Sequence, residues 1–358
     1  MRDLLPYDSC LHREEPWYYF VPPIYKVFNV SLVVSLVKDI KKAQAVIALA
    51  GMVMFLIVID SQCFNSDSAC LPDYGFYISA PNVISDQELL LKGLANGTIN
   101  SEWKEKPGEV YGVIASGKLT GNYHTLSIIS SVALLIVTYF LVLRITENRL
   151  AGIISVMIVD LSRTFLWYSD SIPYPGFWSV LFFASLYPFK NRFIRPIAYL
   201  TSFVMKAQAL AFLPITFFRE KNRKVRIFYV IIGVVAAIGA SVLKWTRIDG
   251  FNIGNLVPPW VVFEIILQDF WVIILFVPVS ITLFYLYRKK VDWAGTILGG
   301  MLWSLFFQYV LALFTTYGAF SERMLPFIVF FAMGCGLIVS KKDIILERIR
   351  KVKEVKTT

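Results

Sequence analysis

Two cations beside apolar sequence are the residues of this chain best suited to chemistry. Arg323 follows Glu322 in the stretch "YGAFSERMLPFIVFFAMG", directly before a long apolar run. Lys206 lies inside a second apolar stretch, "PIAYLTSFVMKAQALAFLPITFF". A lysine within a bilayer-spanning segment costs about 2.5–3.5 kcal/mol on insertion scales, so Lys206 requires an anionic partner. For Glu322 and Arg323, the alternative is an interfacial pair whose charged groups simply reach out to water.

The composition indicates a membrane protein. Of the 358 residues, 57% are hydrophobic, 16% are aromatic and only 17% are charged. A soluble domain of this length needs more polar surface, and long apolar windows recur along the chain. The formal net charge is +10, and most of the excess Lys and Arg brackets the apolar windows. This arrangement favours the positive-inside rule over nucleic-acid binding as the origin of the charge.

The positive-inside rule predicts an all-α transmembrane bundle of about eight full spans, with both termini in the cytoplasm. The first clean apolar window starts too late for a cleavable signal peptide and is expected to remain as the first span. It sends a long loop, residues 61–124, to the outer face. The expected spans are 43–60, 125–143, 150–168, 176–189, 227–243, 269–287, 293–315 and 325–340.

A re-entrant hairpin is expected in residues 196–218, because basic clusters flank both ends of this apolar segment. "KNRFIR" precedes it and "REKNRKVR" follows it. One full crossing would place one cluster outside, and the segment is too short for two crossings at about 1.5 Å rise per residue. Two half-helices that return to the cytoplasmic side satisfy both clusters. The alternative is that the positive-inside rule fails at one loop.

The pattern divides the chain into three parts. Residues 1–42 are aromatic and amphipathic, and are expected to lie in the cytoplasmic interface. Residues 43–340 form the transmembrane domain, which includes the outer loop, and residues 341–358 form a basic cytoplasmic tail. No internal repeat is visible, whereas transporters built from inverted repeats usually show one.

The outer loop carries the polar material of the predicted outer face. Cys63 and Cys70 are close in sequence, and an oxidising compartment favours a disulfide between them. Metal binding by these cysteines is not expected, because the only histidine of the loop, His124, stands at its end. The stretch "DQELLLKGLANG", residues 86–97, is typical of a short amphipathic helix that ends at glycine.

The order of these pieces resembles the polyprenyl-phosphate-dependent glycosyltransferases of the GT-C superfamily, in particular their bacterial and archaeal mannosyltransferase-like members. The matching stretches are "PDYGFY" or "SDQELLLKGLANG", "EKPG", "MKAQALAFLPITFF" and "SERMLPFIVFFAMG". Met324 stands where the family usually has tyrosine, and the family's strongest acidic doublet is absent. The resemblance implies a multi-pass enzyme of a prokaryotic cell membrane that transfers a sugar with inversion at the outer face.

The resemblance also implies a carboxylate that takes a proton from the acceptor hydroxyl. Asp73 is the first choice for this base and Asp86 the second; either of them could instead be a solvated loop acid or a helix cap. Asp170 follows the third span and is expected to orient the acceptor or a metal ion. Glu88 and His124 are expected to support the site.

Arg323 and Lys206 are then expected to hold the lipid phosphate, and Glu322 to fix Arg323. The expected partners are a polyprenyl-phosphate sugar donor, a lipid, glycan or protein acceptor, and the bilayer, but no nucleic acid. No cofactor or metal site is assigned, although the resemblance leaves a divalent cation open. Two alternatives need no outer carboxylate: a carrier or flippase for lipid-linked sugars, and a structural subunit of a membrane complex.

Overall fold

The computed structural model describes residues 107–120, 125–169, 176–191, 193–242, 269–312 and 321–347. Within these ranges the chain forms helices joined by short connections, and no strand occurs. The predicted all-α class is therefore confirmed for this part of the chain.

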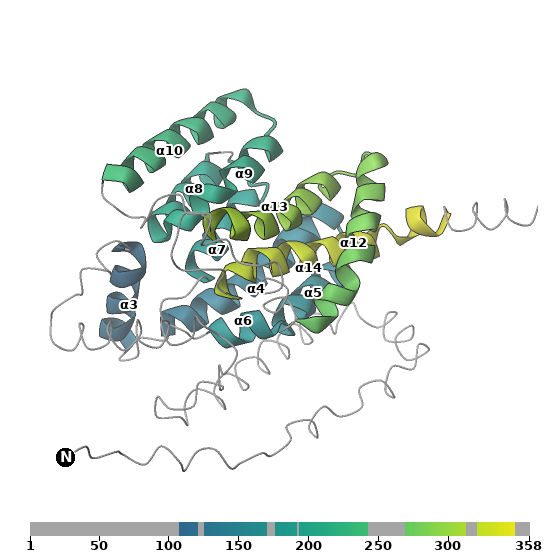
Figure 1. The fold of residues 1–358 in the computed structure, drawn as a ribbon, viewed down its shortest axis with the longest axis horizontal. Coiled ribbons are helices and arrows are strands. Elements are labelled where there is room, and N and C mark those ends of the chain that lie inside the picture. The colour runs from purple at the N-terminus through teal and green to yellow at the C-terminus, as the bar shows by residue number, and fades with distance from the viewer. Residues whose placement is uncertain are drawn as a thin grey trace, which may run out of the picture. The chain divides into compact units, whose positions relative to one another are not determined.

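The helices follow one another in the order drawn in Figure 1. The α-helices are α3 (Pro107–Thr120), α4 (Thr125–Thr146), α5 (Arg149–Asp160), α6 (Arg163–Tyr168), α7 (Gly176–Leu186), α8 (Ile194–Met205), α9 (Leu213–Arg219), α10 (Arg223–Val242), α12 (Phe270–Arg288), α13 (Ala294–Ala312) and α14 (Leu325–Ser340). Two 3₁₀ helices, η4 (Ala207–Phe212) and η6 (Ser321–Met324), complete the set.

Helix α14 is the centre of the bundle. Nearly all of its residues from Leu325 to Leu337 are buried, and it packs against α4, α5, α12 and α13. Figure 1 shows it passing between these helices. The Ser155 hydroxyl on α5 donates a hydrogen bond to the Ala332 carbonyl of α14 at 2.8 Å. Glycine at position 336 lets the two backbones come this close, because a Cβ there would meet the Ala151 carbonyl oxygen at 2.8 Å.

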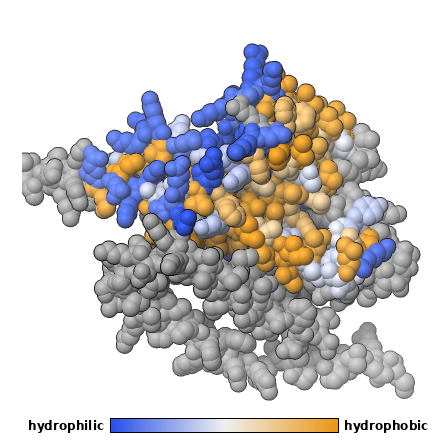
Figure 2. All heavy atoms as spheres, turned by 180° about the vertical axis from the view of Figure 1, so that it is seen from behind, coloured by the Kyte–Doolittle hydropathy of each residue, from blue (hydrophilic) through white to orange (hydrophobic). Residues whose placement is uncertain are grey.

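Apolar side chains point outward from several helices. Ile274, Ile281 and Phe284 of α12 are more than half exposed. Helix α10 presents a row at helical spacing that includes Ile231 and Val235. In Figure 2, hydrophilic side chains gather along one edge of the visible face, beside a wide hydrophobic area. Such apolar surface marks a lipid or protein contact.

Two helices of the described part, α4 and α12, are long and apolar enough to cross a membrane. This finding indicates association with a membrane. The expected count of eight spans and the orientation of the termini remain predictions.

The expected third span, residues 150–168, is interrupted in the structure. Helix α5 ends at Asp160, and α6 begins at Arg163 after a short break. Ser162 caps the second helix, because its hydroxyl accepts a hydrogen bond from the Phe165 amide at 3.2 Å. A serine hydroxyl that bonds to nearby backbone offers the chain an alternative to a continuous helix.

Helix α3 was not predicted. It lies inside the expected outer loop, where the sequence favoured a helix only over residues 86–97, which are outside the described residues. Pro107 is its first residue, a position that suits the fixed φ of proline. The segment contains several glycines, and because glycine is a poor helix former its sequence does not predict a helix.

Candidate functional site

The apolar segment around Lys206 is a broken helix. Helix α8 ends at Met205, Lys206 has an extended backbone with φ −150° and ψ 124°, and η4 begins at the next residue. The Lys206 amide still bonds to the Ser202 carbonyl at 3.1 Å, so the break is confined to one residue. Lys206 therefore stands at the break between two helical arms, α8 on one side and η4 with α9 on the other. The re-entrant hairpin expected for this segment remains a prediction.

Three hydrogen bonds hold the two arms in place. The Tyr199 hydroxyl of α8 donates to the Ala209 carbonyl of η4 at 2.9 Å, and thereby joins the arms to each other. The Trp303 indole of α13 donates to the Ala211 carbonyl at 2.7 Å. The Ser202 hydroxyl donates to the Trp178 carbonyl of α7 at 2.7 Å. Two of these bonds are made to carbonyl groups of η4, Ala209 and Ala211, and the third joins α8 to α7.

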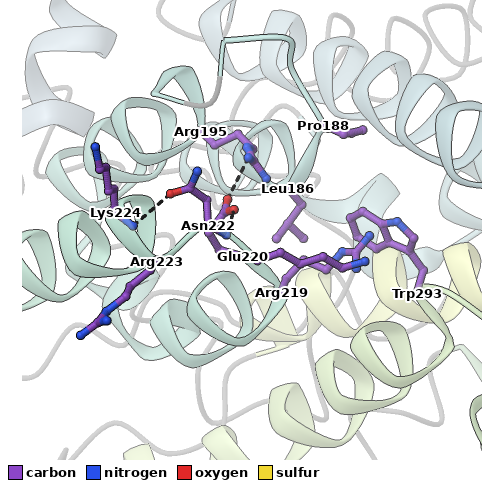
Figure 3. A pocket seen from close by; sticks show the side chains of 10 residues that line it. Leu186, Pro188, Arg195, Arg219, Glu220, Asn222, Arg223, Lys224 and Trp293 are labelled. Carbon is purple, nitrogen blue, oxygen red and sulfur yellow. Dashed lines mark hydrogen bonds and ion pairs between the residues drawn. The ribbon is translucent and has the colours of Figure 1, made fainter.

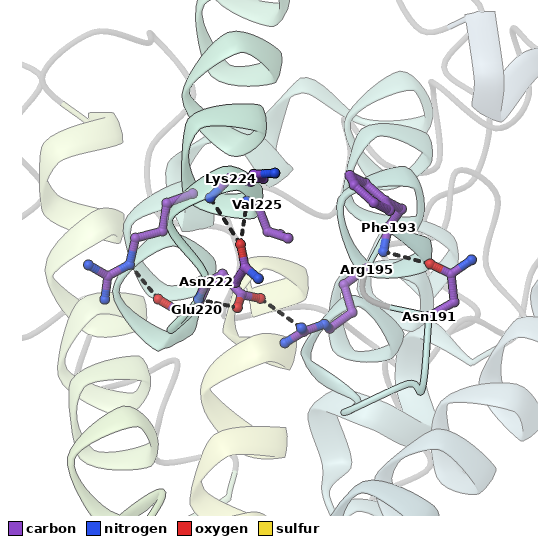
Figure 4. Close-up of polar contacts among 8 residues, drawn as sticks. Asn191, Phe193, Arg195, Glu220, Asn222, Lys224 and Val225 are labelled. Atoms are coloured by element: carbon purple, nitrogen blue, oxygen red, sulfur yellow. Dashed lines mark hydrogen bonds and ion pairs between the residues drawn. The ribbon is translucent and has the colours of Figure 1, made fainter.

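An ion pair closes the base of this hairpin. Arg195 in the first turn of α8 lies 2.8 Å from the carboxylate of Glu220, which directly follows α9 (Figure 4). Both side chains are largely buried, at 16% and 5% exposure. The start of α8 and the residue after α9 therefore lie close together. Insertion of this segment into a bilayer remains a prediction.

Arg323 lies in the turn that leads into the central helix. Residues Ser321–Met324 form η6, α14 begins at Leu325, and Pro326 occupies its first turn. The Arg323 side chain is half-buried, and η6 packs beside α6 and α13. The N-terminus of a helix carries a partial positive charge, so the start of α14 and Arg323 together make this end of the helix positive.

An aromatic cluster fills the space between the hairpin and α14. The Phe212 ring of η4 lies 5.1 Å from Phe182 and 6.0 Å from Phe307, measured between ring centroids. Phe182 in turn lies 6.1 Å from Phe330 of α14. These rings couple the broken helix to the central one, because a buried side chain in close packing cannot move independently of its neighbours.

Sequence reasoning missed a buried carboxylate, Asp269. It is 2% exposed and precedes α12. It accepts hydrogen bonds from the Ser162 hydroxyl at 2.9 Å, the Thr164 hydroxyl at 2.8 Å and the Arg163 amide at 2.7 Å. Through these hydrogen bonds Asp269 anchors the start of α6. The sequence feature that could have revealed Asp269 is its position directly before a long apolar segment.

Most of the expected site residues lie outside the described residues. They are Asp73, Asp86, Glu88, His124 and Asp170, together with the cysteines Cys63 and Cys70. The side chain of Glu322 also falls outside them. Their expected roles remain predictions. Among the residues that are described, no cluster of His, Cys, Asp and Glu could hold a metal ion.

The chain matches no protein-family model, no curated protein and no solved structure.

Proposed function

We propose that this protein is a membrane-integral glycosyltransferase that moves a sugar from a polyprenyl-phosphate donor to an acceptor at the outer face. The observation that supports this most is the one-residue break that puts Lys206 between two packed helical arms. A cation at such a break is suited to contact an anionic ligand. A lipid phosphate provides the anion, and its tail stays in the bilayer.

Arg323 is the second cation of the proposed site. Its guanidinium offers a planar set of donors that matches phosphate oxygens. The positive end of the α14 dipole reinforces it. Because the phosphate gains charge as the sugar departs, this residue stabilises the transition state more than the bound donor. A carboxylate of the outer loop, Asp73 or Asp86, is proposed to take the acceptor proton.

The test is Arg323→Ala in the full-length protein, with polyprenyl-phosphate mannose as the donor. We expect the transfer rate to fall by about 100- to 1,000-fold, the usual effect of removing one oxyanion donor. Arg323→Lys should recover only part of the rate, because a point charge does not reproduce the planar fork. Arg144→Ala is the control, since Arg144 is an exposed cation in the last turn of α4. Wild-type rates in folded Arg323→Ala would refute the phosphate contact.

A lipid-linked-sugar carrier is the second candidate. The specific observation in its favour is that two segments of the bundle are interrupted, α5–α6 at Ser162 and α8–η4 at Lys206. In transporters, interrupted helices surround the substrate site. A carrier needs no outer base, so Asp73→Asn combined with Asp86→Asn should leave carriage of the lipid-linked sugar intact. The same double variant should abolish sugar transfer by an enzyme.

A further inference from the structure

A cavity of about 640 Å³ lies at the base of the hairpin, where α8 begins and α9 ends (Figure 3). Its charged lining is dominated by cations. Its walls consist of Leu186, Pro188, Arg195, Arg219, Glu220, Lys221, Asn222, Arg223, Lys224 and Trp293. The lining therefore contains five cationic residues and a single carboxylate, and the cavity attracts an anion.

Three helices begin around this cavity. Arg195 lies in the first turn of α8, Arg223 and Lys224 in the first turn of α10, and Trp293 directly precedes α13. None of the three helices has an acidic residue in its first turn. Cations at helix N-termini oppose the helix dipole, which favours negative charge there. A bound anion would satisfy the dipoles and the cations together.

The carboxylate of Glu220 is only partly satisfied. Its Oε1 accepts a hydrogen bond from the Asn222 amide at 2.8 Å, whereas its Oε2 lies 2.8 Å from the Arg195 guanidinium but has no hydrogen-bond donor among the described residues. The carbonyl of Glu220 accepts a hydrogen bond from Arg226. Yet the Nε–H group of Arg195 is buried and has no acceptor among the described residues. A buried donor without an acceptor is costly, and a ligand oxygen would relieve that cost.

One cation of the lining, Arg219, is paired with a carboxylate that is not part of the lining. Arg219 bonds to Asp292, and its guanidinium covers the Trp293 ring at 4.0 Å from the centroid. Arg223 and Lys224, by contrast, are exposed at the mouth. The positive-inside rule accounts for cations at this end of the bundle, but not for the cavity between them or for the buried donor of Arg195.

Apolar side chains continue outward from the mouth of the cavity. On α8, Ile194 is 41% and Ile197 54% exposed. On α10, Ile227 and Ile231 are each 52% exposed. We propose that the cavity binds the phosphate headgroup of an anionic lipid whose chains lie along these two helices. Basic pockets between helices are a common form of headgroup site. A soluble phosphate ester offers the same anionic group without the chains.

The test is native mass spectrometry of the full chain in detergent, titrated with phosphatidylglycerol, with phosphatidylcholine and with inorganic phosphate. We expect saturable binding of phosphatidylglycerol. Arg223→Gln combined with Lys224→Gln should weaken it about tenfold or more, because two charge-assisted contacts are lost. Both side chains are exposed, so the variant should fold, and thermal unfolding checks this. Arg144→Gln combined with Lys342→Gln removes the same charge away from the cavity and should bind as the wild type does.

Two results would overturn the proposal. Equal binding of phosphatidylglycerol by the cavity variant and the wild type would show that the lipid does not bind in this cavity. Displacement of the lipid by a similar concentration of inorganic phosphate would assign the cavity to a soluble phosphate ester instead. Neither outcome depends on sugar transfer, so the proposed function is tested separately.

Discussion

Arg219 holds Asp292 through two parallel hydrogen bonds, with Nη1 to Oδ1 at 2.9 Å and Nη2 to Oδ2 at 3.0 Å. The pair joins the last residue of α9 to the short connection between α12 and α13. The same guanidinium lies on the Trp293 ring, so its orientation is fixed from two sides. The hairpin is therefore attached to the rest of the bundle at its base as well as through its arms.

The Arg219–Asp292 pair should make the free energy of unfolding depend on pH in the acid range. Burial alone would raise the pKa of Asp292, but the hydrogen bonds and charge of Arg219, with a contribution from Lys221, lower it below the ordinary value of 3.8. A lowered pKa adds stability above the unfolded pKa, and that stability is lost as the pH falls through the folded pKa. We expect wild type to melt above Asp292→Asn at neutral pH, and this gap to close only below pH 3.8.

The difference in stability between wild type and Asp292→Asn should be small, because the Asp292 side chain is 64% exposed. Exposed ion pairs contribute about 1 kcal/mol or less. Thermal unfolding over a series of pH values measures it. If the two proteins already melt at the same temperature near neutral pH, a group other than Asp292 causes the dependence on pH.

The buried pair at the base of the hairpin should matter more. Glu220→Gln leaves the guanidinium of Arg195 largely buried without its counter-charge. Breaking a buried pair from one side typically costs about 3–5 kcal/mol. We expect denaturant unfolding to show a loss of this order, well above that of Asp292→Asn. Adding Arg195→Gln to Glu220→Gln should restore part of the stability, and the absence of any restoration would argue against the pair as the cause.

The topology prediction concerns the two ends of the hairpin. Cysteines at Lys190 and Lys224, which are exposed positions on either side of the segment, should both react with an impermeant thiol reagent from the cytoplasmic side only. The background is a variant whose native cysteines are serine. Lys118→Cys on α3 is the control and should react from the opposite side. Reaction of only one hairpin position from outside would mean that the segment crosses the membrane.

Close packing of α5 and α14 should make position 336 intolerant of a side chain. In Gly336→Ala the new methyl group meets the Ser155 hydroxyl and the Ala151 carbonyl, and overpacking of this kind costs about 1–3 kcal/mol. Gly299→Ala is the matched control, because no atom outside the backbone of its own helix and its chain neighbours lies within 4 Å of its Cβ position. We expect a lower melting temperature for the first variant only. Equal melting temperatures would show that the helices separate easily here.

The expected hairpin is a prediction that rests on charge. Two basic clusters flank one apolar segment, and a single crossing would place one of them outside, so the positive-inside rule favours a return of the chain. The position of the break at Lys206 was not predicted, since the sequence indicated only that a cation in this apolar segment needs special surroundings. The close approach of Arg195 and Glu220 agrees with a return of the chain. Insertion into the bilayer itself is still untested.

Features that depend on distant partners were not predicted. Asp269 stabilises the break between α5 and α6 from a position 107 residues beyond Ser162, and no local pattern reveals such a contact. The basic cavity was missed for a similar reason, since only packing decides which cations of two clusters face each other. The proposed base, Asp73 or Asp86, and the expected bridge between Cys63 and Cys70 lie outside the described residues.

The position of α14 has a consequence for biosynthesis. Translation proceeds from the N-terminus, so the ribosome makes the walls of the bundle, α4, α5, α12 and α13, before it makes the helix that they enclose. Until α14 is made, the side chains of these helices that bury it lack their packing partner. Completion of the core is therefore a late event in the life of the nascent chain, and chains released before Leu325 would lack their centre rather than an edge.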